Sequence, residues 1–242
     1  MRVIVTRPTR QGERTAVQLA ERGHQALLLP LTHPVPDGNA ARNALARSNG
    51  AIAVTSAEAI YALFNLGQLA ASDLARPLFA VGKATAAEAS EAGFRSIFCA
   101  DGDGTQLADL ISDHRGLLQD MPLIYLAGSP RAEGFEARLR ELAIEFETIG
   151  CYRMDDIEPP EAELRRLFVD GPAAAILFYS RHTAERFFNL PLLRRHPNTL
   201  DRTRLVCLSN AVAGAVPDSL RSNVEVPTVP DEESLLTLLD AG

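Results

Sequence analysis

Small polar residues follow the apolar, strand-like runs of this sequence at six places. The pairs are Thr6 and Arg7, Thr55 and Ser56, Gly82 and Lys83, Gly128 and Ser129, Ser180 and Arg181, and Ser209 and Asn210. Each pair leads into a predicted helix, and a helix N-terminus offers free N–H groups and a partial positive charge to an anion. In parallel α/β sheets, ligands bind beyond the carboxyl ends of the strands. The set predicts a site for a large polyanion; the alternative is that these side chains only cap helices.

Tyr152 is a further candidate for chemistry. It lies in the segment 150–160, which ends in two prolines and borders the space expected between two domains. A tyrosine hydroxyl can donate a proton to a leaving group. The alternative is an aromatic side chain that only packs the segment.

Several other kinds of site are not indicated. The sequence has neither a G-x-x-x-x-G-K-[ST] phosphate loop nor a G-x-G-x-x-G after its first strand. Ser56 and Ser180 lack the G-x-S-x-G elbow, and the five histidines show no metal-ligand spacing. Cys99, Cys151 and Cys207 have no C-x-x-C spacing, so we expect buried, reduced thiols. The sequence therefore indicates no metal site, phosphate loop or dinucleotide site.

Strand-like and helix-like runs alternate along the chain, which favours parallel sheets with helices on both faces. We expect strands at 3–6, 26–31, 51–55, 78–81, 94–99, 123–127, 145–149, 174–179, 205–208 and 224–226. We expect helices at 10–22, 39–48, from 55 through Leu66, 84–92, 107–114, 130–143, 161–169, 182–189, 211–220 and 232–239. Thr55 to Glu58 fits a capping box, and Ser129 followed by Pro130 predicts a capped helix start.

The two halves of the chain resemble each other. The runs 51–56 and 175–180 match, as do 78–82 and 205–209, 105–110 and 233–238, and 3–31 and 123–151. This indicates one α/β unit used twice, unless two generic α/β patterns coincide. Proline-rich segments at 30–37 and 150–160 hold equivalent places and are interpreted as connections, because proline does not suit a central strand. They suggest a chain that leaves one domain and later returns; the alternative is a simple division near Asp120.

The composition is that of an ordinary globular protein. The chain has 242 residues, a formal net charge of −7, and 46% hydrophobic residues. It lacks a basic block for nucleic acid and an apolar run long enough to span a membrane. The run from Met1 to Thr6 enters a strand directly, so we expect no leader peptide and a cytoplasmic protein.

Taken together, these motifs resemble the uroporphyrinogen-III synthase family over essentially the whole chain. The resemblance rests on Val5-Thr-Arg-Pro8, Val54-Thr-Ser56, Ala80-Val-Gly-Lys-Ala-Thr-Ala86, Cys151-Tyr-Arg153, and Phe178-Tyr-Ser180 followed by Phe187 and Phe188. It implies two similar α/β domains, each a parallel sheet flanked by helices, joined by a two-stranded linker. The implied domains are 1–33 with 157–242, and 38–150, with linkers at 34–37 and 151–156.

The resemblance also implies a reaction. Family members close hydroxymethylbilane into uroporphyrinogen III in tetrapyrrole biosynthesis, inverting ring D through a spiro intermediate and releasing water, without a cofactor. The substrate carries eight carboxylates. By match, Tyr152 assists departure of the hydroxyl and Thr6 and Arg7 bind a carboxylate. The remaining substrate-binding candidates are Ser56, Lys83, Thr85, Ser129, Ser180 and Asn210.

Two departures from the family pattern stand in the second half. Val212 replaces a threonine in the turn Ser209–Ala213, and Tyr179 replaces the usual threonine beside Ser180. The leading hypothesis is a monomeric lyase acting on hydroxymethylbilane. The alternative is a non-catalytic synthase-like module that binds a small polyanion.

Overall fold

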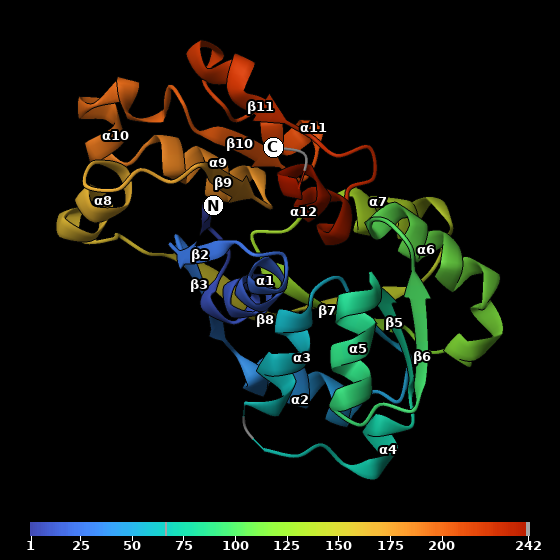
Figure 1. Cartoon of the computed structure of the whole chain (residues 1–242). Coiled ribbons are helices and arrows are strands. Elements are labelled where there is room, and N and C mark those ends of the chain that lie inside the picture. Colours follow the sequence, from blue (N-terminus) through green and yellow to red (C-terminus); the bar gives the residue numbers. More distant parts are fainter. Residues whose placement is uncertain (66, 241–242) are drawn as a thin grey trace. The chain divides into compact units, whose positions relative to one another are not determined.

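The computed structural model describes residues 1–65 and 67–240, and they form two compact units (Figure 1). Unit 1 comprises Met1–His33 and Asp155–Gly242, and unit 2 comprises Pro34–Met154. The strands of unit 1 are β1 Arg2–Val5, β2 Gln25–Leu28, β9 Ala175–Phe178, β10 Arg204–Cys207 and β11 Val224–Glu225. Its helices are α1 Thr9–Glu21, α8 Glu161–Phe168, α9 Arg181–Phe188, α10 Pro191–Arg195, α11 Asn210–Ala213 and α12 Glu232–Asp240, with 3-10 turns at Pro197–Leu200 and Asp218–Asn223.

Unit 2 is built in the same way. Its sheet contains β3 Thr32–Pro36, β4 Ile52–Val54, β5 Pro77–Val81, β6 Ser96–Ala100, β7 Leu123–Ser129 and β8 Phe146–Asp156. The helices are α2 Gly38–Arg47, α3 Ala57–Phe64, α4 Ala71–Leu74, α5 Lys83–Glu91, α6 Gly104–Asp113 and α7 Gly134–Glu141, with a 3-10 turn at Arg115–Leu118. The expected end of the third predicted helix, Leu66, lies outside the described residues.

The two sheets have the same spatial order of equivalent strands. In unit 1 the order is β2-β1-β9-β10-β11, and in unit 2 it is β8-β7-β4-β5-β6, with β3 added beyond β8. Within these two equivalent sets, each strand pairs in parallel with its neighbours. The order follows the repeat seen in the sequence, because β7 and β8 hold the places of β1 and β2.

Helices cover both faces of each sheet, as the sequence predicts, because alternate strand residues point to opposite faces. On β1, Ile4 packs with residues of α8 to α11, whereas Val3 and Val5 pack with Leu19 of α1 and with α12. In unit 2, α2, α3 and α5 cover one face and α6 and α7 cover the other (Figure 1). The parallel α/β fold is confirmed.

Several sequence predictions at element boundaries are wrong. Ser129 does not cap a helix at Pro130: it is the last residue of β7, pairs with Arg153, and is followed by a cis peptide bond, and α7 begins only at Gly134. The helix expected at 211–220 is only four residues long, because Gly214 and Pro217 interrupt it. At α3 the capping residue is Ser56 rather than Thr55.

Strands make up much of the two proline-rich segments: β3 covers Thr32–Pro36 and β8 extends to Asp156, while residues 157–160 lie outside any strand. β3 lies at the edge of its sheet, where Pro34 and Pro36 remove no hydrogen bond from a central ladder. Hydrogen bonds from the Asp37 amide to the Cys151 carbonyl and from the Ile157 amide to the Leu31 carbonyl tie the two segments together. The cysteine prediction also needs one correction, because Cys99 is exposed on the edge strand β6 while the other two thiols are buried.

Candidate functional site

Tyr152 lies at the carboxyl end of the parallel strands of unit 2. It lies in the second half of β8, and its partner in the ladder is Gly128, the residue before the last of β7. Its half-buried ring packs against the core formed by β4, α3 and α5. The carboxyl ends of parallel strands are where α/β proteins bind ligands, so Tyr152 remains a candidate for contact with a ligand.

The Tyr152 hydroxyl is held by the N-terminus of α3. It hydrogen-bonds with the side chain of Ser56, whose Oγ also accepts a hydrogen bond of 3.2 Å from the amide of Glu58. Burial raises the pKa of Tyr152 to about 12, although the hydrogen bond with Ser56 lowers this pKa by a smaller amount. The phenol is therefore neutral at physiological pH and able to donate its proton.

The other candidates of unit 2 are spread along the same edge. Lys83 is the exposed first residue of α5, which follows β5 and begins after Gly82 in a positive-φ conformation. Thr85 lies two residues further on in the first turn of α5 and is buried, with 7% of its surface exposed. Ser129 is exposed at the end of β7. Lys83 and Ser129 thus reach solvent at the carboxyl edge, and Thr85 faces the core.

In unit 1, Ser180 and Asn210 also follow strand ends. Ser180 caps α9 by accepting a hydrogen bond of 3.1 Å from the Thr183 amide, and its Oγ donates to Thr183 Oγ1 at 2.8 Å. Asn210 is exposed at the start of α11, which Ser209 caps. Val212, which stands where the family has threonine, is buried in the core. Ser56, Ser180 and Ser209 therefore cap helices. Helix capping is the alternative to ligand binding that the sequence leaves open for such residues.

Thr6 and Arg7 follow strand β1 of unit 1, and both side chains make contacts within that unit. Thr6 is fully buried, and its hydroxyl donates to the Leu177 carbonyl at 2.8 Å, which links the end of β1 to β9. Arg7 Nη1 lies 2.7 Å from Glu232 Oε1 and donates to Thr15 Oγ1 at 3.2 Å. The Arg7 guanidinium also lies over the Tyr179 ring, 4.2 Å from its centroid.

Sequence reasoning missed the carboxylate that organises this part of unit 1. Glu232 Oε1 at the start of α12 accepts hydrogen bonds from Arg7, from Thr15 Oγ1 at 2.5 Å and from the Tyr179 hydroxyl at 3.1 Å. Burial raises the pKa of Tyr179, and the nearby Glu232 raises it further. The only sequence signal was the unusual tyrosine at 179, which fills space beside Arg7 that a threonine would leave empty.

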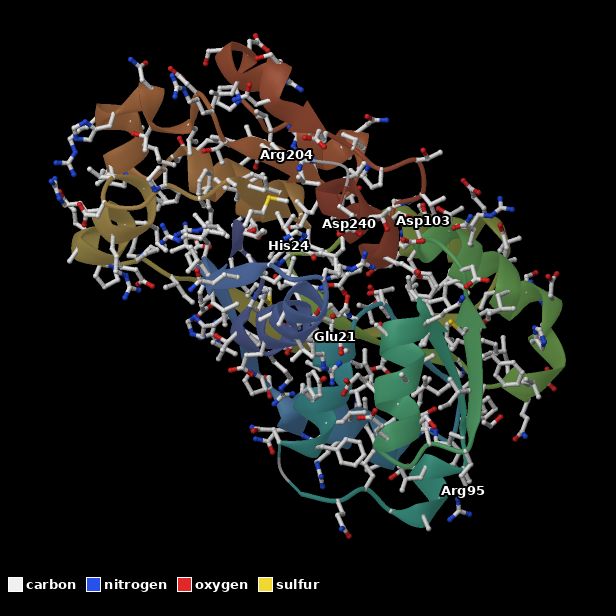
Figure 2. All side chains as sticks on the ribbon, in the orientation of Figure 1. Glu21, His24, Arg95, Asp103, Arg204 and Asp240 are labelled. Atoms are coloured by element: carbon white, nitrogen blue, oxygen red, sulfur yellow. The ribbon has the colours of Figure 1, made fainter. Side chains whose placement is uncertain are left out.

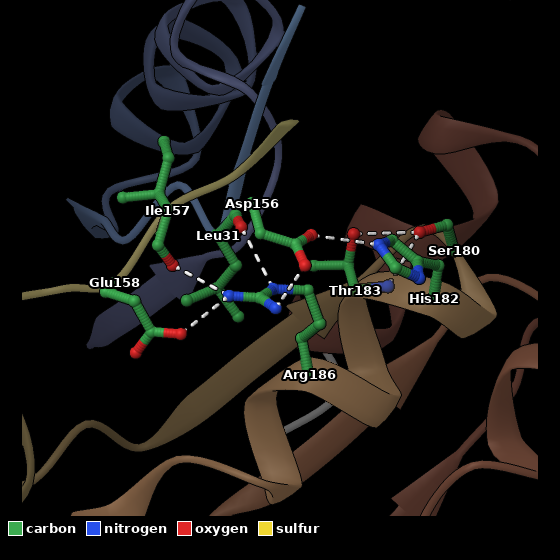
Figure 3. A network of polar contacts seen from close by, with 8 residues as sticks. All are labelled: Leu31, Asp156, Ile157, Glu158, Ser180, His182, Thr183 and Arg186. Atoms are coloured by element: carbon green, nitrogen blue, oxygen red, sulfur yellow. Dashed lines mark hydrogen bonds and ion pairs between the residues drawn. The ribbon is translucent and has the colours of Figure 1, made fainter. Parts of the chain in front are cut away.

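A second polar network holds the ends of the two proline-rich segments within unit 1 (Figure 3). Arg186 of α9 donates to the Leu31 carbonyl at 3.3 Å and to the Ile157 carbonyl at 3.0 Å. Its guanidinium also pairs with Asp156 at 2.5 Å, and Asp156 lies 3.2 Å from His182 Nε2. One arginine thus fixes where both segments leave unit 1.

A pocket of about 550 Å³ lies at the opposite, amino edge of the unit 1 sheet. Its lining includes His24, Arg204 and Asp240 (Figure 2), together with Arg22, which pairs with Asp240 at 2.6 Å. No sequence candidate lines it. Across residues 1–65 and 67–240, no three His, Cys, Asp or Glu side chains gather as a metal site would require. Within the same residues, every helix is too short or too polar to cross a membrane.

Comparisons with known proteins agree with the parallel α/β fold of this chain. The structural match to a uroporphyrinogen-III synthetase from Helicobacter pylori covers 100% of this chain and 99% of that chain, with 16% identity and a TM-score of 0.64. The match to a mutant uroporphyrinogen III synthase from Thermus thermophilus covers 100% of this chain and 96% of that chain, with 20% identity and a TM-score of 0.56. These likenesses establish the fold. Among curated proteins, the comparison gave no match.

The family model described as uroporphyrinogen-III synthase HemD matches residues 13–237. This range contains both carboxyl edges apart from Thr6 and Arg7, and it includes Tyr152, Ser56 and Glu232. The chain therefore belongs to the uroporphyrinogen-III synthase family, whose members are lyases that cyclise hydroxymethylbilane in haem biosynthesis.

Proposed function

We propose that this chain closes hydroxymethylbilane into uroporphyrinogen III with the Tyr152 phenol assisting departure of the hydroxymethyl oxygen. The observation that carries the proposal is the placement of Tyr152. A neutral phenol with a pKa of about 12 stands at a carboxyl edge, joined to the start of a helix through Ser56. A proton donor at this edge can reach a substrate bound beyond the strand ends.

The hydrogen bonds give the proton a direction. Because Ser56 Oγ accepts from the Glu58 amide, the Ser56 hydroxyl proton can point to Tyr152 Oη, which leaves the phenol proton for the substrate. The C–O bond of the hydroxymethyl group breaks, and the oxygen leaves as water with that proton. When the ring closes, the attacking pyrrole releases a proton. The tyrosinate takes it back, so the enzyme returns to its starting state.

The substrate carboxylates require donors rather than a strongly basic surface. We propose that Lys83, Ser129, Ser180 and Asn210 contribute donors from the two carboxyl edges. Glu232 and Thr15 engage Nη1 of Arg7, and Nη2 makes no hydrogen bond within the described residues, so it can receive a carboxylate. Neutral donors and helix N-termini can bind a polyanion although the chain carries a net charge of −7. Binding in the correct folded shape supplies much of the rate.

Thr6 and Thr85 have a different part in this proposal. Both are buried, so we propose that they act through the backbone that they hold rather than by direct contact. The lack of a cofactor and of a nucleic-acid partner, the monomeric state and the cytoplasmic location stay predictions from the sequence.

The decisive assay mixes the purified chain with hydroxymethylbilane and separates the isomers of the product. We expect type III product at a rate above spontaneous closure to type I, and type I alone overturns the proposal. Tyr152→Phe should reduce kcat by about 10–100-fold with little change in KM. Tyr125→Phe, which removes a buried hydroxyl that hydrogen-bonds to Thr55 Oγ1 at 3.1 Å, is the matched control and should leave kcat within about twofold.

A further inference from the structure

Gly128 lies directly beneath the Tyr152 ring. A Cβ built on Gly128 would overlap the Cζ and Cε2 atoms of that ring and its hydroxyl oxygen. We infer that Gly128 is a positioning residue for the reaction: its bare Cα is the surface on which the Tyr152 phenol rests, and no other residue type leaves the hydroxyl beside Ser56. The inference rests on the proposed role of Tyr152.

A β-bulge brings the ring to this place. Ala127 pairs with Gly150 and Gly128 pairs with Tyr152, so Cys151 is an extra residue on β8. In a regular strand, Tyr152 would share a face with Phe146 and Thr148, which contact the core under α6 and the α7 residue Glu136. The bulge turns Tyr152 to the other face, beside Cys151 and toward the start of α3.

The backbone of Gly128 does not itself demand glycine. Glycines 23, 67, 82, 93 and 102 adopt a positive φ, whereas Gly128 lies in the extended strand β7 outside that region. An alanine could adopt the same backbone conformation at no cost in strain. What excludes a side chain is the close approach of the Tyr152 ring, which links the glycine to the function of the tyrosine.

The experiment compares Gly128→Ala with Gly150→Ala, a glycine on β8 where a Cβ would meet no heavy atom within 4 Å. Each is made alone and in a Tyr152→Ala background. We expect Gly128→Ala to lower kcat by about 10-fold or more, with KM changed less, and Gly150→Ala to leave kcat within about twofold. In the Tyr152→Ala background, Gly128→Ala should lower kcat by less than about twofold further, because there is no ring left to displace.

A spectroscopic readout separates displacement of the ring from general damage. The chain has four tyrosines and no tryptophan, so tyrosinate absorbance is easily followed. After a rapid jump to about pH 10.5, a phenol with a pKa of about 12 stays protonated, whereas an exposed phenol with the usual pKa of about 10 is mostly ionised. The absorbance change of each protein, minus that of the same protein carrying Tyr152→Phe, gives the contribution of Tyr152 alone. We expect fast ionisation of Tyr152 in Gly128→Ala but not in Gly150→Ala.

The outcomes are distinguishable. If Tyr152→Phe leaves kcat unchanged, the proposed role of the tyrosine fails. If Tyr152→Phe lowers kcat while Gly128→Ala does not, or if Gly128→Ala costs as much without the ring as with it, the positioning role is overturned. If Gly128→Ala unfolds, the double variant decides: recovery of the melting temperature in Gly128→Ala with Tyr152→Ala supports the overlap with the ring, and no recovery contradicts it.

Discussion

Glu232 offers a sharp test of how the carboxyl edge of unit 1 is organised. Glu232→Gln keeps an oxygen that can accept hydrogen bonds from Thr15 and Tyr179, but it removes the charge that faces Arg7 at 2.7 Å. The change is therefore almost isosteric. It tests the ion pair rather than the packing around it.

The size of the effect follows from the exposure of the pair. A hydrogen bond between charged groups contributes roughly 1.5–3 kcal/mol and a neutral one about 0.5–1.5 kcal/mol, so the charge is worth about 1–2 kcal/mol. The Arg7 and Glu232 side chains are 22% and 28% exposed, and screening by solvent reduces this to about 1 kcal/mol. For a chain of this length we expect Tm to fall by about 2–4 °C.

The assay compares thermal unfolding of Glu232→Gln with that of Glu233→Gln, whose side chain is exposed on the same helix. Only the first should lower Tm. Glu232→Gln also leaves the Arg7 charge unneutralised, so we expect KM for hydroxymethylbilane to fall about two- to fivefold at low salt. Equal Tm values for the two variants would refute the network, and an unchanged KM would refute carboxylate binding by Arg7.

Buried groups give three further predictions. Arg186→Gln should lower the free energy of unfolding by about 1–2 kcal/mol, because it removes the donor to the Ile157 carbonyl and one of the two partners of the Leu31 carbonyl and of Asp156; urea titration measures this. Thr6→Val should cost about 1–3 kcal/mol by leaving the Leu177 carbonyl unsatisfied, and an unchanged urea midpoint would contradict the contact. The third concerns pH, because burial raises the pKa of the Cys151 and Cys207 thiols from 9.0 to about 12.

These raised thiol pKa values fix the direction of the pH effect. The folded chain binds the protons more tightly than the unfolded chain, so the stability they contribute is fully present below about pH 9 and is lost as the pH rises toward 12. The urea midpoint should therefore fall between about pH 8 and pH 10.5, and a constant midpoint would show that the thiols are accessible to solvent.

The sheets could be predicted from the sequence because their strands are buried on both faces. Runs such as 3–6, 51–55 and 174–179 are apolar without alternation, and each precedes a helix with a clear apolar face. The repeat also gave the equivalence of β1 with β7 and of β9 with β4. Ser56 and Ser180 were correctly identified as polar residues at strand ends for the same reason.

The features that the sequence could not give depend on register and on distant contacts. Nothing local marks Cys151 as the extra residue of a bulge, because a bulge is defined by the partner strand. Ser129 and Pro130 have the local pattern of a helix start, but pairing of Ser129 with Arg153 keeps the chain extended. Glu232 and Arg7 are in contact although they are 225 residues apart in the sequence. Such contacts form only once the sheet has been assembled.

Binding at the carboxyl edges is tested most directly by hydrogen–deuterium exchange with and without uroporphyrinogen III under anaerobic conditions. The first amides of a helix have no partner within it and exchange quickly, so a bound ligand should slow them measurably. We expect slower exchange at the starts of α3, α5 and α9 and around Tyr152. Slower exchange confined to the amino edges of the sheets, near His24 and Arg204, would contradict binding at the carboxyl edges.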